Sequence, residues 1–145
     1  MVDKNAVFYV CSLIEYIGRE TKNHRSYVVQ KMGENGVRHH LEFADINHCL
    51  PFEQVCAEVV KKYGIKNGTF DTVSHCKYNI PFFIDIGSVY RDLVVEQATE
   101  MPVEKAVIAV FSSFISDAIS NFNSDMYYQS PQYLLACYKA GEILY

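Results

Sequence analysis

The segment PFEQVCAEVVKKYG, residues 51–64, decides the fold class because its apolar side chains repeat with the period of an α-helix. They recur at i, i+3, i+4 and i+7, which places them on one buried face: Phe52, Val55, Cys56, Val59, Val60 and Tyr63. Pro51 suits the first turn of a helix, and Gly64 suits the left-handed residue that ends one. The segment therefore predicts an amphipathic helix, and with it an α-helical domain.

Three more helices are predicted on the N-terminal side of this segment, over about residues 5–20, 25–34 and 37–48. The first of them carries two apolar stripes, so we expect neighbouring elements to contact it on two sides. One stripe holds Val7, Val10, Cys11, Ile14 and Ile17, and the other holds Tyr9, Leu13 and Tyr16.

On the C-terminal side, the helical pattern stops over residues 65–80, which contain two turn signals and are interpreted as a connecting loop. Helices are then predicted over about residues 81–97, 102–122 and 130–141. The 102–122 segment is the longest and the most apolar of these. Because a helix that is apolar on most sides normally lies at the centre of a bundle, we expect this one to close the core.

These elements predict a single all-α domain, a bundle of six or seven helices over residues 1–145. We expect one helical layer over 1–64, the connecting loop over 65–80 and a second helical layer over 81–145. A length of 145 residues is that of one ordinary domain, and a chain that is 50% hydrophobic and 21% charged has a globular composition.

The five cysteines are odd in number and scattered, and none forms a CxxC pair. A secreted disulfide framework is denser and even-numbered, so we expect reduced thiols in a cytoplasmic protein. The apolar run near the N-terminus is interrupted by Ser12 and Glu15, which makes it too short and too polar to span a membrane. It also lacks the basic start and cleavage site of a signal peptide.

Tyrosine is concentrated at the C-terminal end, where residues 122–145 hold five of the eleven tyrosines. Three interpretations fit this pattern: the half-buried flank of the closing helix, a partner-binding face, or a base-stacking platform. Stacking on bases is the weakest of the three, because Lys139 is the only basic residue of the segment. If the segment binds a partner, the predicted contacts are Tyr128, Tyr133 and Tyr138.

Two His-Cys pairs raise the alternative of a metal-dependent enzyme or a Cys/His hydrolase. The residues concerned are His48, Cys49, His75 and Cys76. A site that joins the two pairs is conceivable, but the chain contains no HExxH, CxxC or HxxxH spacing. The glycines match neither a P-loop nor a dinucleotide fingerprint, so no cofactor is expected.

Residues 19–40 raise the alternative of a DNA-binding regulator, because basic residues and two short predicted helices meet there. The candidate phosphate contacts are Arg19, Lys22, Arg25 and Arg38. Against this alternative, the chain has a net charge of −4, and Glu42 and Asp45 would repel phosphate. Nucleic acid is therefore not the expected partner.

Several segments resemble a family of small bacterial proteins that carry an all-helical domain of unknown function. In the N-terminal half they are IEYI, SYVVQKMGENGV, HHLEFADINH and FEQVCAEVV. In the C-terminal half, IGSVYRDLV and FISDAISNFNSDMYYQSPQYLLACYKAG are also similar to sequences of this kind. The family has no established catalytic residues, and some of its members resemble small companions encoded beside toxin-like enzymes. The resemblance therefore implies a regulatory or antitoxin-like binding protein.

The expected function is non-catalytic, because the sequence has abundant aromatic side chains and no convergent polar site. We expect the chain to bind another protein or to associate with itself as a homo-oligomer.

Overall fold

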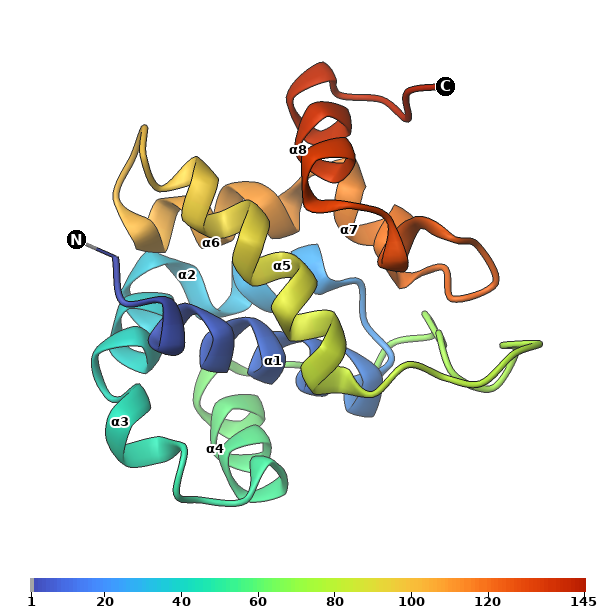
Figure 1. Ribbon diagram of the computed structural model, residues 1–145. Coiled ribbons are helices and arrows are strands. Elements are labelled where there is room, and N and C mark those ends of the chain that lie inside the picture. The colour runs from blue at the N-terminus through green and yellow to red at the C-terminus, as the bar shows by residue number, and fades with distance from the viewer. Residues whose placement is uncertain (1) are drawn as a thin grey trace.

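A computed structural model describes residues 2–145, and all regular structure in this range is helical (Figure 1). The eight α-helices are α1 (Lys4–Thr21), α2 (Arg25–Glu42), α3 (Ala44–Asn47), α4 (Phe52–Tyr63), α5 (Phe83–Gln97), α6 (Val103–Ser112), α7 (Phe114–Ser120) and α8 (Pro131–Ala140). A 3-10 turn, η1 (Met126–Tyr128), precedes α8. The prediction of a single all-α domain is confirmed, with slightly more helices than the six or seven expected.

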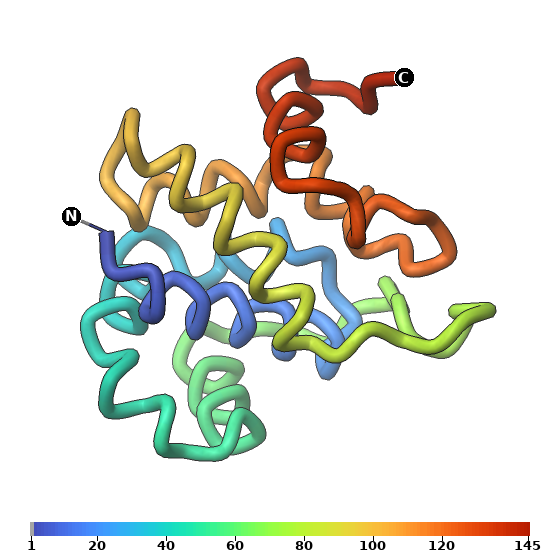
Figure 2. The backbone as a smooth tube through the Cα atoms, viewed as in Figure 1, coloured from blue at the N-terminus to red at the C-terminus, as the bar shows by residue number. Residues whose placement is uncertain are grey.

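The centre of the bundle is α1, which lies between α5 and α2 while α2 in turn packs on α6 (Figures 1 and 2). The side chains of α1 that are fully withdrawn from solvent include Val10, Cys11, Leu13, Ile14 and Ile17. Its two apolar stripes are thus buried on two sides, as expected. The central position therefore belongs to α1, and the first part of the 102–122 segment that was expected there, α6, packs on α2 and α5.

Two of the predicted helices have different boundaries because the backbone breaks where the apolar pattern continues. The 102–122 segment is divided at Ser113, which has an extended backbone (φ −79°, ψ 168°). The Ser113 hydroxyl accepts a hydrogen bond from the Ile115 N–H at 3.3 Å and so caps α7. In α2, the predicted break at residues 34–37 is a kink at Gly33, where φ is 68°.

The connecting loop over 65–80 is attached to the end of α1. The Gly68 N–H donates to the Thr21 carbonyl at 2.8 Å, and the Phe70 N–H donates to the Lys22 carbonyl at 2.8 Å. A Cβ atom on Gly68 would lie 2.5 Å from the Lys22 carbonyl oxygen, so only glycine allows this close approach. The loop is therefore fixed to the helical core.

Across residues 2–145, no helix combines the length and the apolar character needed to cross a lipid bilayer.

Candidate functional site

Four aromatic residues from two distant parts of the chain meet at one surface. Tyr78 comes from the connecting loop, Phe122 follows α7, and Tyr127 and Tyr128 belong to η1; together they line a hollow of about 420 Å³. Tyr78 is 68% exposed and Tyr128 is 67% exposed. We call these four residues the aromatic surface; it lies on the right of Figure 1, where the loop approaches η1.

The aromatic surface is held in place by contacts between rings. Tyr127 packs edge-to-face on Phe122, with ring centroids 5.8 Å apart, and on Tyr128 at 4.9 Å. The Arg19 guanidinium lies over the buried Phe122 ring, 4.9 Å from its centroid. The rings on the η1 side are therefore fixed against one another.

Asn123 joins the loop to the segment after α7. Its side-chain oxygen accepts a hydrogen bond from the Lys77 N–H at 2.7 Å, and its amide nitrogen donates to the His75 carbonyl at 3.2 Å. The Cys76 thiol donates to the Tyr78 carbonyl at 3.3 Å. These bonds hold the backbone of residues 75–78, so that the exposed Tyr78 ring is presented from a hydrogen-bonded part of the loop.

Only one of the three tyrosines predicted to contact a partner lines this hollow. Tyr128 is part of the aromatic surface, whereas Tyr133 and Tyr138 lie on α8 and do not line its hollow. The Tyr133 hydroxyl donates to the Leu144 carbonyl. Tyr138 is half-buried, and burial together with Glu100 raises its pKa. The hollow also includes Tyr78, which the sequence indicated only as part of a turn.

Arg25, one of the predicted nucleic-acid contacts, is completely buried in an ion pair. Its Nε donates to Glu15 Oε1 at 2.9 Å and its Nη2 donates to Glu15 Oε2 at 2.8 Å. Arg19 Nε donates to the same carboxylate at 2.7 Å. Burial acts to raise the pKa of Glu15, but the two guanidinium groups outweigh it, and the net pKa is lowered. From this position Arg25 cannot reach a phosphate.

The other two basic candidates are exposed but lie apart. Lys22, at the C-terminal end of α1, is 3.9 Å from Asp71, and its side chain is 55% exposed. Arg38, in the last turns of α2, pairs with Glu104 at 3.0 Å. Arg19, Lys22, Arg25 and Arg38 thus do not form the continuous basic surface that binding to nucleic acid needs.

The two His-Cys pairs occupy different hollows. His48 lines a groove beside α1, and Cys49 Sγ lies 3.5 Å from its Nδ1. His75 and Cys76 line a hollow between the loop and the end of α7. In the part of the chain that the structure describes, no three His, Cys, Asp or Glu side chains are grouped so as to hold a metal ion.

A polar pair that the sequence did not indicate joins α2 to α7. His24 Nδ1 lies 2.8 Å from Asp117 Oδ1, and the imidazole stacks on Phe70 with centroids 3.8 Å apart. His24 and Asp117 are 93 positions apart in sequence, so no local pattern could have indicated the contact. Both side chains are about half exposed, and the pair ties the start of α2 to the loop and to α7.

Comparisons with known proteins returned no match to this chain among family models, curated proteins or solved structures.

Proposed function

We propose that this chain is a non-catalytic protein-interaction module of a regulatory, antitoxin-like kind, which binds another protein through the aromatic surface. The observation that carries the proposal is the exposure of Tyr78 and Tyr128, two large rings that line the same hollow from segments 50 positions apart. Tyrosine is enriched among the residues that contribute most to protein–protein binding, because its ring buries a large area at a small entropic cost.

The surroundings of the two rings support this proposal. Asn123, Ser124 and Asp125 line the same hollow, so an apolar centre is bordered by polar groups. This arrangement is the usual anatomy of a protein interface. Asp125 adds a negative charge at the border, which suits a basic side chain on the partner.

We place this activity in the cytoplasm. All five cysteines are free thiols, and the three with the least exposure are Cys11, Cys56 and Cys137. Free thiols persist in the reducing conditions of the cytoplasm.

A double variant, Tyr78→Ser with Tyr128→Ser, tests the proposal. Affinity capture from the native host, quantified by mass spectrometry, should recover a partner with the unaltered chain and lose it with the double variant. Tyr145→Ser is the matched control, because Tyr145 is fully exposed and lies outside the aromatic surface.

Light scattering over a range of concentrations distinguishes self-association from binding of another protein. A dimer that dissociates in the double variant would identify a second copy as the partner. Capture that is unchanged by the double variant, together with unchanged oligomeric mass, would overturn the proposal.

A further inference from the structure

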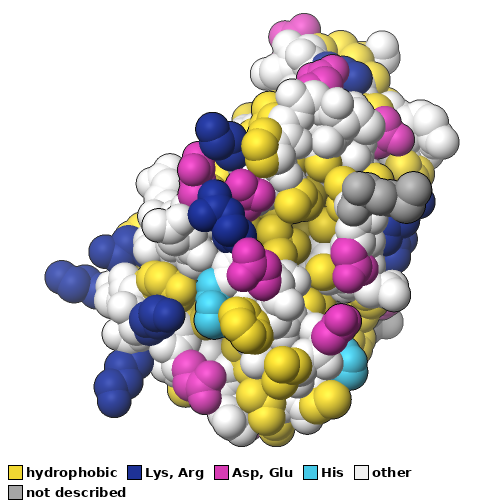
Figure 3. Space-filling view, turned by 90° about the vertical axis from the view of Figure 1, so that its left-hand side faces the viewer, with side chains coloured by type: hydrophobic (Ala, Val, Ile, Leu, Met, Phe, Trp, Pro, Cys, Tyr) yellow, Lys and Arg dark blue, Asp and Glu magenta, His cyan; other side chains and the backbone are white. Residues whose placement is uncertain are grey.

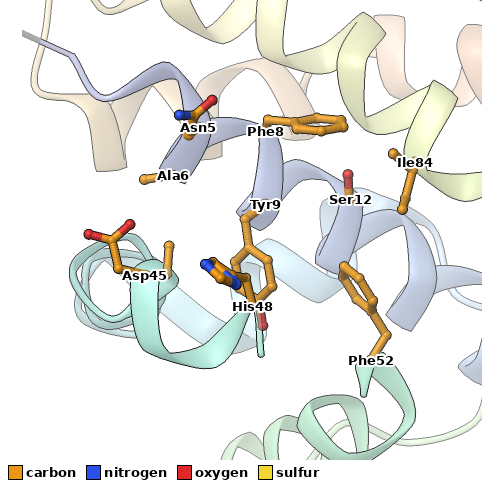
Figure 4. A pocket seen from close by; sticks show the side chains of 10 residues that line it. Asn5, Ala6, Phe8, Tyr9, Ser12, Asp45, His48, Phe52 and Ile84 are labelled. Carbon is orange, nitrogen blue, oxygen red and sulfur yellow. The ribbon is translucent and has the colours of Figure 1, made fainter. Parts of the chain in front are cut away.

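A groove of about 380 Å³ lies away from the aromatic surface, between the N-terminal half of α1, α3 and the start of α4 (Figure 4). Six of its lining residues carry the argument: Asn5, Phe8, Tyr9, Asp45, His48 and Phe52. This volume is within the range of about 300–1,000 Å³ that is typical of small-molecule sites.

The groove has a polar end and an apolar end. Figure 4 shows Asn5, Asp45 and His48 at the α3 end, and Phe8 and Phe52 towards the start of α4 and α5. At the apolar end the Tyr9 and Phe52 rings pack together, with centroids 5.5 Å apart. A molecule that fits both ends must itself have one apolar part and one polar part.

Two hydroxyl groups in the wall of the groove lack hydrogen-bond partners. Tyr9 is 7% exposed and Ser12 is 2% exposed, and neither Tyr9 Oη nor Ser12 Oγ is bonded within the described chain. Buried polar atoms of this kind are rare in native proteins, and bound water or a ligand often accounts for them.

The charge at the polar end is negative. Asp45 is exposed and forms no salt bridge with any residue in the range 2–145, and neither lysine nor arginine lines the groove. Asp3 and Glu42 line an adjoining hollow on the other side of Ala6, where Arg38 is already paired with Glu104. On this face hydrophobic side chains form a strip with Asp and Glu side chains on both sides of it, and with Lys, Arg and His side chains also on its left side (Figure 3). The field at the groove therefore attracts cations.

From these observations we infer that the groove binds a small hydrophobic amine. Its ring lies against Phe8, Tyr9 and Phe52, and its ammonium group pairs with the Asp45 carboxylate at the α3 end. A carboxylate of the same shape is repelled by Asp45, which makes the site selective for charge.

Three probes of similar shape and different charge test this inference: phenethylamine, phenethyl alcohol and phenylacetate. Each is titrated into the full chain while the backbone amide signals are followed by NMR. We expect the amine to bind about threefold to fivefold more tightly than the alcohol, which is the ratio that one exposed ion pair supplies. We expect phenylacetate to bind more weakly than the alcohol, and the shifted signals to belong to α1, α3 and the start of α4.

The variant Asp45→Asn removes the negative charge of the groove while it keeps the shape of the side chain. Asp45 is exposed and accepts no hydrogen bond within the described chain, so we expect the variant to fold. Its affinity for phenethylamine should fall to that of the unaltered chain for phenethyl alcohol, while its affinity for the alcohol stays the same. Glu142→Gln is the control, because Glu142 is an exposed carboxylate that lines neither the groove nor the aromatic surface, and its removal should change neither affinity.

Equal binding of all three probes, no binding of any, or an unchanged amine affinity in Asp45→Asn would overturn the inference. These outcomes are independent of partner capture through Tyr78 and Tyr128, so the two proposals fail separately.

Discussion

The two ends of α1 bury polar side chains in opposite ways. At the C-terminal end, which we call the closed end, Glu15 receives three hydrogen bonds from Arg25 and Arg19. In the N-terminal half, which we call the open end, the Tyr9 and Ser12 side chains line a groove, and their buried hydroxyls have no hydrogen-bond partner within residues 2–145. The comparison shows where buried polar groups are bonded to one another and where they are not.

The largest expected effect on the free energy of unfolding is that of Arg25→Met, at the closed end. This change leaves the Glu15 carboxylate buried without its main partner, and breaking a buried ion pair from one side costs about 3–5 kcal/mol. We expect the free energy of unfolding, measured by urea denaturation, to fall by that amount. Glu15→Leu in the same chain should restore much of the loss, because an apolar pair of similar volume replaces the ions.

Arg38→Met is the matched control for this measurement. Arg38 also pairs with a carboxylate, that of Glu104, but its side chain is 44% exposed. Exposed pairs contribute about 0–1 kcal/mol, so Arg38→Met should have little effect. If the two arginine variants are equally stable, the buried pair does not stabilise the closed end.

His40, buried on α2, makes the stability of the protein depend on pH. Burial, helped by His39 and Lys62 and opposed by Glu58, lowers the pKa of His40 from 6.5 to about 4. The unfolded chain therefore binds a proton more readily than the folded one. The full stability is present above pH 6.5 and is lost as the pH falls towards 4, by up to roughly 3 kcal/mol.

Urea denaturation at pH values between about 7 and 4.5 measures this loss. His40→Met removes the titrating group, so the part of the pH dependence that belongs to His40 should disappear in the variant. A pH profile that is the same in both proteins would show that protonation of His40 is not what destabilises the fold.

Gly18→Ala tests how tightly the closed end is packed. A Cβ atom on Gly18 would lie 2.5 Å from Arg25 Cδ and 2.7 Å from Arg25 Nε, and the arginine is fixed by its bonds to Glu15. Overpacking of this kind costs about 1–3 kcal/mol of unfolding free energy. In an Arg25→Met background the cost of Gly18→Ala should shrink, and equal costs in both backgrounds would show that Arg25 is not the obstacle.

Helices were predictable where a single local pattern determines them. The stripe and end signals of residues 51–64 correctly predicted α4, and the N-cap Ser130 with Pro131 correctly predicted the start of α8. The break at Ser113 was missed because the apolar residues on both sides of it face the same core. Periodicity detects a shared buried face and does not detect a serine that caps a new helix within it.

The sites were less predictable, because the fold brings their residues together from distant positions. Arg25 belongs to a basic stretch of sequence, and only the packing of α1 and α2 shows that its side chain crosses Gly18 to reach Glu15. Tyr128 was predicted as a contact, whereas Tyr78 joins it through loop contacts made by Asn123. The one feature of the sequence that could have indicated Tyr78 was its position as an aromatic residue in a predicted loop.

The smallest expected effect is the difference in unfolding free energy between two variants that each remove a tyrosine hydroxyl, Tyr90→Phe and Tyr9→Phe. Tyr90 belongs to the closed end: burial and the nearby Glu15 raise its pKa, and its hydroxyl donates to the Ser116 carbonyl at 3.1 Å. Removing that hydroxyl should lower the unfolding free energy by about 0.5–1.5 kcal/mol.

Tyr9→Phe removes a buried hydroxyl that has no hydrogen-bond partner within residues 2–145, so its effect on the unfolding free energy should be close to zero or slightly stabilising. Parallel urea denaturation of both variants measures the difference. If Tyr9→Phe destabilises the protein as much as Tyr90→Phe does, the Tyr9 hydroxyl is already satisfied in the free protein, for example by an ordered water. The buried polar groups at both ends of α1 would then have hydrogen-bond partners, and the binding role of the groove would depend on Asp45 and the aromatic rings alone.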